Sequence, residues 1–113
     1  DYTSSGGITG TLDEIVAWLP EGLSVFSWCL HSISTHEITF TGQDTANGRV
    51  HLFNRNGLVW EGNDEVLDVG GHYVDEYVRD GDRWRIRHRE ERTVYMVGGE
   101  FAAMLNKMVA RQG

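Results

Sequence analysis

The stretch Gly70–Glu91, GGHYVDEYVRDGDRWRIRHREE, predicts two long β-strands joined by a tight turn. Apolar and polar side chains alternate on both sides of Asp80-Gly81, which is the period of two typical of a sheet with two different faces. Gly81 favours a hairpin turn because glycine adopts positive φ without a steric penalty. The apolar face of such a hairpin must be covered, so we expect other segments of the chain to pack against it.

Two registers of this hairpin fit the sequence. A two-residue turn sets Val78 opposite Arg83, and a three-residue turn sets Val78 opposite Trp84. We favour the three-residue turn because it also sets Asp75 opposite Arg87 and so pairs opposite charges across the strands. In that register one apolar face is formed by Val74, Val78, Trp84 and Ile86.

The composition is that of one soluble globular domain spanning residues 1–113. Apolar residues make up 40% of the chain, charged residues make up 24%, and the net charge is -7. A negative chain is a poor partner for nucleic acid, and no apolar run approaches the roughly 20 residues of a membrane-spanning helix. The single cysteine, Cys29, excludes an internal disulfide and suits a reducing compartment, so we expect a cytoplasmic protein.

The segments outside the hairpin predict an α+β fold. Thr11–Glu14 is a capping box that begins a helix ending near Pro20, and Glu100–Arg111 has apolar residues at the spacing of a second, terminal helix. Residues 36–40 and 45–60 alternate as strands do, which gives about four or five antiparallel strands in all. Two helices are too few to cover such a sheet, so we expect a pocket or an interface.

Three stretches carry a family resemblance. Asn47-Gly48, Val69–Arg79 and Asp82–Ile86 together resemble the SnoaL-like branch of the NTF2-like superfamily, which includes scytalone dehydratase, bile-acid 7α-dehydratase and hexachlorocyclohexane dehydrochlorinase. The resemblance implies a cone, in which a strongly bent mixed β-sheet and helices on its concave side enclose an apolar pocket. It also implies a homodimer or homotrimer and a small apolar ligand. Many members need no cofactor, so none is expected.

The resemblance also assigns roles to residues. The general-base histidine of the family falls on His31, and a catalytic arginine falls on Arg89. Asn56 falls where the dehydratases have a histidine or an aspartate. The substrate-pocket residues implied are Tyr2, Trp28, Cys29, Leu52, Asn54, Asn56, His72, Val74 and Thr93. An N-terminal helical segment that would carry an aspartate beside the histidine is not seen before the strand of Tyr2.

Each chemical role has a plainer alternative. His31 is either a base tuned by a nearby carboxylate or a core histidine bonded to backbone. Arg89 reaches the pocket only if a β-bulge lies between Ile86 and Arg89, and otherwise it is a solvent-facing cation that pairs with Glu90 or Asp75. By default Cys29 is a small buried apolar residue. Surface positions are expected for His36, His51 and His88.

The sequence shows no His/Cys/carboxylate spacing of the kind that binds zinc, so no metal is expected. The favoured function is cofactor-independent elimination, a lyase reaction of a small, largely apolar molecule, with His31 removing the proton. The alternatives are a non-catalytic ligand-binding or oligomerisation module, or isomerase, cyclase or epoxide hydrolase chemistry on the same fold. A carboxylate at the His31 ring would favour the enzyme, and a ring bonded only to backbone would favour the module.

Overall fold

The structure, a computed structural model, describes residues 2–4 and 9–112. The elements in chain order are β1 (Tyr2–Ser4), β2 (Thr9–Gly10), α1 (Leu12–Gly22), β3 (Trp28–Phe40), β4 (Thr45–Trp60), β5 (Asn63–Asp80), β6 (Arg83–Val97) and α2 (Glu100–Gln112). The described strands form one six-stranded sheet in the order β2-β1-β6-β5-β4-β3. All neighbours are antiparallel except β1 and β6, which are parallel, so the sheet is mixed.

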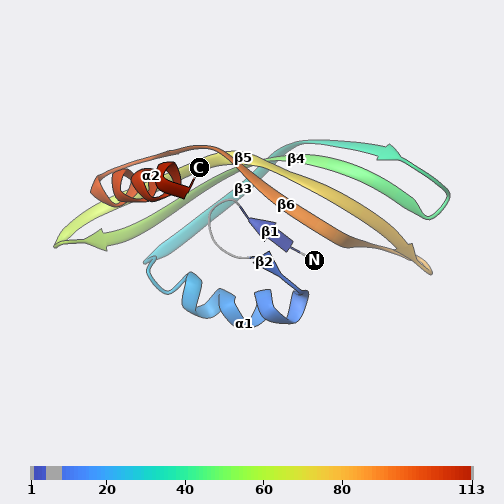
Figure 1. Cartoon of the computed structure of the whole chain (residues 1–113), viewed down its shortest axis with the longest axis horizontal. Helices are drawn as coiled ribbons and strands as arrows, with labels where there is room; N and C mark the ends of the chain where they lie inside the picture. The colour runs from blue at the N-terminus through green and yellow to red at the C-terminus, as the bar shows by residue number, and fades with distance from the viewer. Residues whose placement is uncertain (1, 5–8, 113) are drawn as a thin grey trace.

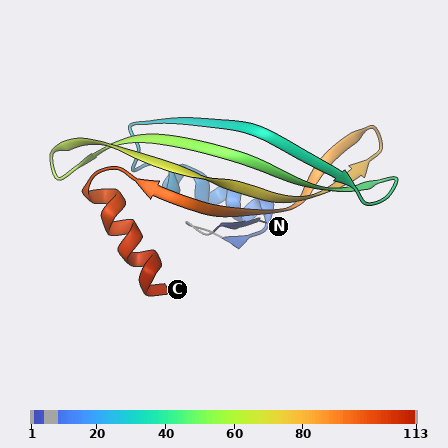
Figure 2. The ribbon, with the colours of Figure 1, turned by 90° about the horizontal axis from the view of Figure 1, so that it is seen from above.

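The long strands β3–β6 bend into an arch. Figure 1 shows α1 beneath this arch and α2 at the end of the sheet where β4 turns into β5. Seen from above in Figure 2, the strands lie over α1, and α2 projects beside β6. The predicted α+β fold with a strongly bent mixed sheet is confirmed, and the sheet has a concave face on the side of α1.

The alternation of β4 identifies the residues of that concave face. Most even-numbered residues of β4 are buried, including Ala46, Val50, Leu52 and Leu58, while its odd-numbered neighbours are mostly exposed. Cross-strand partners point to the same face of a sheet. The concave face therefore continues through the odd-numbered residues of β5, because each of them pairs with an even-numbered residue of β4.

The hairpin between β5 and β6 has a register that differs from both predictions. Its turn is Gly81-Asp82, with Gly81 at a φ of 66°, and Asp80 pairs with Arg83. Tyr77 consequently lies opposite Ile86, and Arg79 lies opposite Trp84.

The apolar face predicted for this hairpin is therefore wrong. Trp84 and Ile86 share the concave face with Tyr77, whereas Val74 and Val78 lie on the opposite face. The predicted pairing of charges fails for the same reason, since Asp75 lies opposite Arg89. The register at the turn differs by one residue from the predicted one, which sets Trp84 opposite Arg79, and the bulge in β6 then sets Arg89 opposite Asp75.

Bulges in three places bend the long strands. In β6 the pairing shifts between Ile86 and His88, which is the bulge that Arg89 needs to reach the concave face. A second shift in β6 separates Thr93 from Tyr95, and β3 has one between Ile33 and His36. A bulge adds local twist and re-aims the side chains that follow it. The one in β6 turns Arg89 onto the concave face.

Helix α2 covers one end of the concave face. Ala102 is buried against Leu58 and Leu67, and Phe101 and Leu105 pack on the same cluster. The predicted packing role of these apolar side chains is confirmed. Helix α1 begins with the predicted capping box of Thr11 and Glu14, but none of its residues is buried. Neither helix of the described chain is long and apolar enough to cross a membrane.

Glu65 of β5 caps the start of α2, so its loss should loosen this helix. Its two carboxylate oxygens accept the backbone N–H groups of Glu100 at 3.1 Å and Phe101 at 3.0 Å. Removing such a cap costs about 1–2 kcal/mol. We expect Glu65→Ala to lower the free energy of unfolding by that amount in a urea titration. Asp64→Ala, which removes the neighbouring exposed carboxylate, serves as the control, and an equal loss in both variants would contradict the capping role.

Candidate functional site

The structure divides the residues implied by the family resemblance between the two faces of the sheet. Seven lie on the concave face by strand register: Cys29, His31, Leu52, Asn54, Asn56, Arg89 and Thr93. For Tyr2 the structure describes the backbone, which pairs with Arg89, but not the side chain.

Trp28, His72 and Val74 lie on the opposite face, so the pocket-lining role expected of them is corrected. The alternation of β3 and β5 sends them there, since they pair with odd-numbered residues of β4. His72 accepts a hydrogen bond from Arg49 at 3.2 Å. Its partial burial and the Arg49 guanidinium lower the pKa of His72. Cys29 is exposed rather than buried.

His31 is held by the side-chain amide of Asn56. The distance between His31 Nε2 and Asn56 Oδ1 is 2.9 Å, and Asn56 is only 4% exposed. A carbonyl oxygen can only accept, so Nε2 carries the proton and Nδ1 is left with its lone pair. The ring thus has neither of the two partners considered from the sequence, a carboxylate or the backbone. The contact fixes the tautomer and the ring orientation without adding a charge.

Arg89 is tied to a buried carboxylate. Its Nε and Nη2 donate to the two oxygens of Asp75, each at 2.8 Å, and the Asp75 side chain has no solvent exposure. The guanidinium also lies over the ring of Tyr73, 4.0 Å from its centroid. The hydrogen bonds to Asp75 raise the pKa of Arg89 further. Pairing with Asp75 is confirmed, but the cation is on the concave face rather than facing solvent.

Tyr73 connects the arginine to the histidine. The Arg89 guanidinium lies over the Tyr73 ring, and the Tyr73 hydroxyl is a hydrogen-bond partner of Asn54. Asn54 is in turn the cross-strand neighbour of His31. Burial raises the pKa of Tyr73, so its hydroxyl stays protonated at neutral pH. Tyr73 and Asn54 therefore lie on the concave face between the strands of Arg89 and His31.

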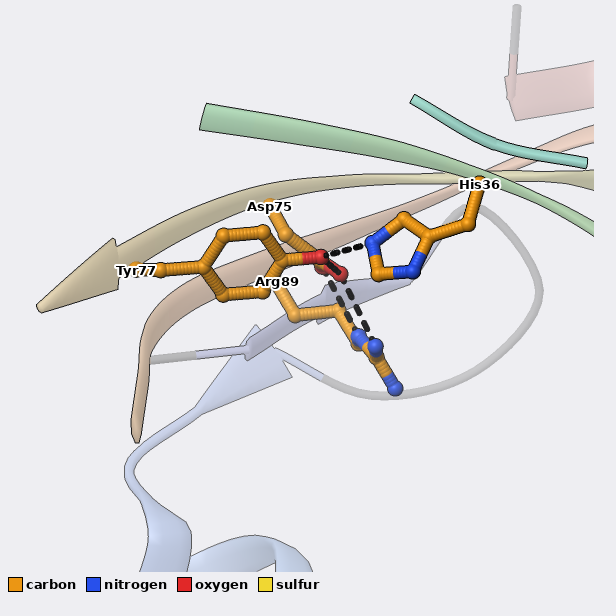
Figure 3. A network of polar contacts seen from close by, with 4 residues as sticks. All are labelled: His36, Asp75, Tyr77 and Arg89. Atoms are coloured by element: carbon orange, nitrogen blue, oxygen red, sulfur yellow. Dashed lines mark hydrogen bonds and ion pairs between the residues drawn. The ribbon is translucent and has the colours of Figure 1, made fainter. Parts of the chain in front are cut away.

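A second arm of the network leads from Asp75 to His36 (Figure 3). The Tyr77 hydroxyl donates to Asp75 Oδ2 at 2.9 Å, and His36 Nε2 lies 2.9 Å from the same hydroxyl oxygen. The hydroxyl has one proton, which it donates to Asp75, so His36 Nε2 must donate. His36 is exposed, as expected, yet its tautomer is fixed with Nδ1 unprotonated.

Tyr77 should titrate later than an ordinary tyrosine. Burial raises the pKa of Tyr77 to about 12, with a smaller contribution from its hydrogen bond to the Asp75 carboxylate. Because this pKa lies above that of the unfolded chain, the stabilisation is complete below about pH 10 and is lost as the pH rises toward 12. Absorbance titration at alkaline pH should show a late phase that Tyr77→Phe removes. An unchanged titration curve in that variant would contradict the assignment.

Four residues of the network were not identified as site residues from the sequence: His36, Tyr73, Asp75 and Tyr77. Three of them occupy successive odd positions of β5, so the alternation itself was the available signal. The predicted hairpin register concealed this alternation, because it placed the even-numbered residues of β5 on the core-facing side.

A hollow of about 310 Å³ lies at the end of the sheet where β5 turns into β6. Its lining residues are His36, Ile38, Phe40, Ala46, Tyr77, Trp84, Arg85 and Ile86. The pocket residues implied by the resemblance do not line it. Within residues 2–4 and 9–112, no three His, Cys, Asp or Glu side chains are grouped as a metal site requires.

Comparisons with known proteins agree on one family. The family model for the SnoaL-like domain matches residues 1–90. An uncharacterised protein of Mycobacterium tuberculosis is 38% identical over 92 residues, which cover 80% of this chain and 60% of that protein. The chain thus spans about three-fifths of the length of its curated relatives.

Solved structures show the same architecture. The Kfla4162 protein from Kribbella flavida is 27% identical with a TM-score of 0.71, and the match covers 88% of this chain and 66% of that one. LinA is 26% identical with a TM-score of 0.73, covering 85% and 65%. The hexachlorocyclohexane dehydrochlorinase LinA-type3 from Novosphingobium barchaimii, at 22% identity and a TM-score of 0.73, shares the fold over 88% and 68%. The chain belongs to the SnoaL-like family.

Proposed function

We propose that the protein is a cofactor-independent lyase that eliminates water or hydrogen halide from a small, largely apolar molecule. The observation that carries the proposal is the placement of His31, whose fixed tautomer leaves Nδ1 able to accept a proton on the concave face. The fold shared with a hexachlorocyclohexane dehydrochlorinase supports the reaction class. Asn54, Tyr73 and Arg89 supply polar groups on the same face.

The roles follow from the hydrogen bonds. Nδ1 of His31 takes a proton from carbon, and the electron pair of that C–H bond becomes the new π bond while the leaving group departs with its own bonding pair. Asn56 Oδ1 continues to accept from Nε2 and so stabilises the imidazolium that forms. The Arg89 guanidinium, held by Asp75 with its other N–H groups uncommitted to that carboxylate, hydrogen-bonds the departing anion.

One observation favours a non-catalytic alternative, a module that binds a small ligand in the same place. In the part of the chain that the structure describes, the partner of the His31 ring is an amide rather than a carboxylate. An amide orients imidazole but does not raise its basicity as a carboxylate would.

Turnover separates the two candidates. The assay offers the 113-residue chain hexachlorocyclohexane, with chloride release as the readout, and 4-hydroxy-4-phenylbutan-2-one, whose dehydration product is a conjugated ketone detected by its absorbance. We expect catalysed loss of chloride or of water. Saturable binding of these compounds with no product would instead establish the module and overturn the lyase.

A further inference from the structure

The hollow at the far end of the sheet is a feature that the proposed reaction does not use. His31 and Arg89 do not line it, and a bulge in β3 separates His36, at its inner end, from the segment that holds His31. Its volume of about 310 Å³ is at the lower end of the range for pockets that bind small molecules. It therefore suits a ligand of one or two fused rings.

The walls of the hollow are aromatic and apolar. Phe40 and Trp84 meet edge to face with ring centroids 5.8 Å apart, and Ile38 and Ile86 continue the same surface. These four side chains are between 44% and 68% exposed. Such a cluster of exposed apolar side chains is unusual unless something binds to it.

A hydrogen-bond acceptor stands at the inner end of the hollow. His36 and Tyr77 both line it, but the Tyr77 hydroxyl is fully engaged, since it donates to Asp75 and accepts from His36 Nε2. Figure 3 shows Nδ1 of His36 on the side of the ring away from that contact. Arg89 and Tyr77 donate to Asp75, and His36 donates to Tyr77. This network leaves the lone pair of His36 Nδ1 for a ligand.

We propose that this hollow binds a small aromatic alcohol, whose ring lies against Phe40 and Trp84 and whose hydroxyl donates to Nδ1 of His36. A ligand of this class satisfies both halves of the site. It covers the apolar walls, and it offers a donor where the network presents only an acceptor. A carboxylate or a phosphate presents acceptor oxygens, which repel the lone pair of Nδ1, so neither anion fits this end of the hollow.

The test compares 2-naphthol with 2-methoxynaphthalene, which has the same rings but no donor. Backbone amide chemical shifts are followed while each compound is titrated into the 113-residue chain. We expect 2-naphthol to shift the amides of Ile38, Phe40 and Ile86, and to bind about three- to tenfold more tightly than its methyl ether. Equal affinities, or shifts confined to the region of His31, would overturn the proposal.

Variants separate the acceptor from the walls. His36→Phe should weaken 2-naphthol three- to tenfold and leave the methyl ether unaffected, whereas Ile38→Arg should abolish binding of both compounds. Leu30→Arg, on the opposite face of the same strand, is the matched control. Concentration-dependent self-association that Ile38→Arg removes, with no naphthol binding, would show that a second copy covers the hollow and would overturn the proposal.

A second measurement is independent of any ligand. Long-range ¹H–¹⁵N spectra of the histidine rings should show His36 protonated on Nε2 alone at alkaline pH, and Tyr77→Phe should release this tautomer. Protonation on Nδ1 would overturn the proposal even if naphthol bound. The lyase assay is a separate readout, since Ile38→Arg changes only a wall of the hollow and should leave the elimination rate unchanged.

Discussion

Replacing His31 with glutamine is expected to lower kcat/KM for the elimination about 10²–10⁴-fold, the contribution of a positioned general base. Glutamine can still donate to Asn56 Oδ1, so the contact on the buried side is kept while the basic Nδ1 is lost. The loss should fall on kcat, with KM changed little, because the proton transfer is made only in the transition state. Initial rates of chloride or enone formation give both constants.

His51 provides the matched control for this substitution. It lies on β4 with its side chain on the opposite face, where its ring contacts His72 at a centroid distance of 6.5 Å. His51→Gln should therefore leave the rate unchanged. Circular dichroism and urea unfolding must match the parent chain in both variants. Full activity in a folded His31→Gln protein would exclude His31 as the base, and an equal loss in His51→Gln would show that the effect is structural.

Arg89→Met should destabilise the fold by about 3–5 kcal/mol, the cost of leaving a buried charge without its partner. The Asp75 carboxylate has no solvent exposure, and of its donors in the described residues it would keep only the Tyr77 hydroxyl. Arg89→Lys should be intermediate, since an ammonium group supplies charge but not the two parallel hydrogen bonds. Urea unfolding with equal m-values in all variants measures these differences.

A double variant distinguishes loss of pairing from loss of packing. Asp75→Leu combined with Arg89→Met removes both charges, and we expect most of the lost stability to return because an apolar pair needs no compensation. Arg55→Met provides an exposed comparison, since its ion pair with Asp68 is 3.6 Å long and the Arg55 side chain is 62% exposed. A double variant less stable than Arg89→Met would show that the ion pair does not account for the effect.

The parts of the fold that could be predicted from sequence are those set by local rules. The capping box of Thr11 and Glu14, the alternation of β4 and the apolar spacing of α2 each depend on residues close together in the chain. The bulge in β6 was left open by the sequence, as the condition on which Arg89 would reach the concave face. Local patterns thus predicted the elements, and in β4 also the buried face.

The register of the β5–β6 hairpin could not be predicted in the same way. Moving the turn by one residue changes which side chains meet. The predicted register would set Trp84 opposite Val78, whereas the observed one sets Arg89 opposite Asp75, its hydrogen-bond partner. That network joins residues of three strands, and its pairing depends on the bulge. The sequence therefore pointed to His31 and Arg89 separately but not to Tyr73, Tyr77 and His36, which connect them or extend the network.

Whether α1 is buried also could not be predicted from the sequence. The apolar residues of this helix lie on one side, yet Leu12 and Val16 are 73% and 58% exposed. Amphipathic spacing states which side of a helix can be buried, but not whether a surface is present to bury it.

The central claim is that His31 removes a proton from carbon in the step that determines the rate. Competition between hexachlorocyclohexane and its fully deuterated form in one reaction, followed by mass spectrometry of the remaining substrate, measures this most directly. The claim predicts that the protiated form is consumed faster by the parent chain, and that the His31→Gln variant consumes neither at a comparable rate. Equal consumption of the two forms would contradict it.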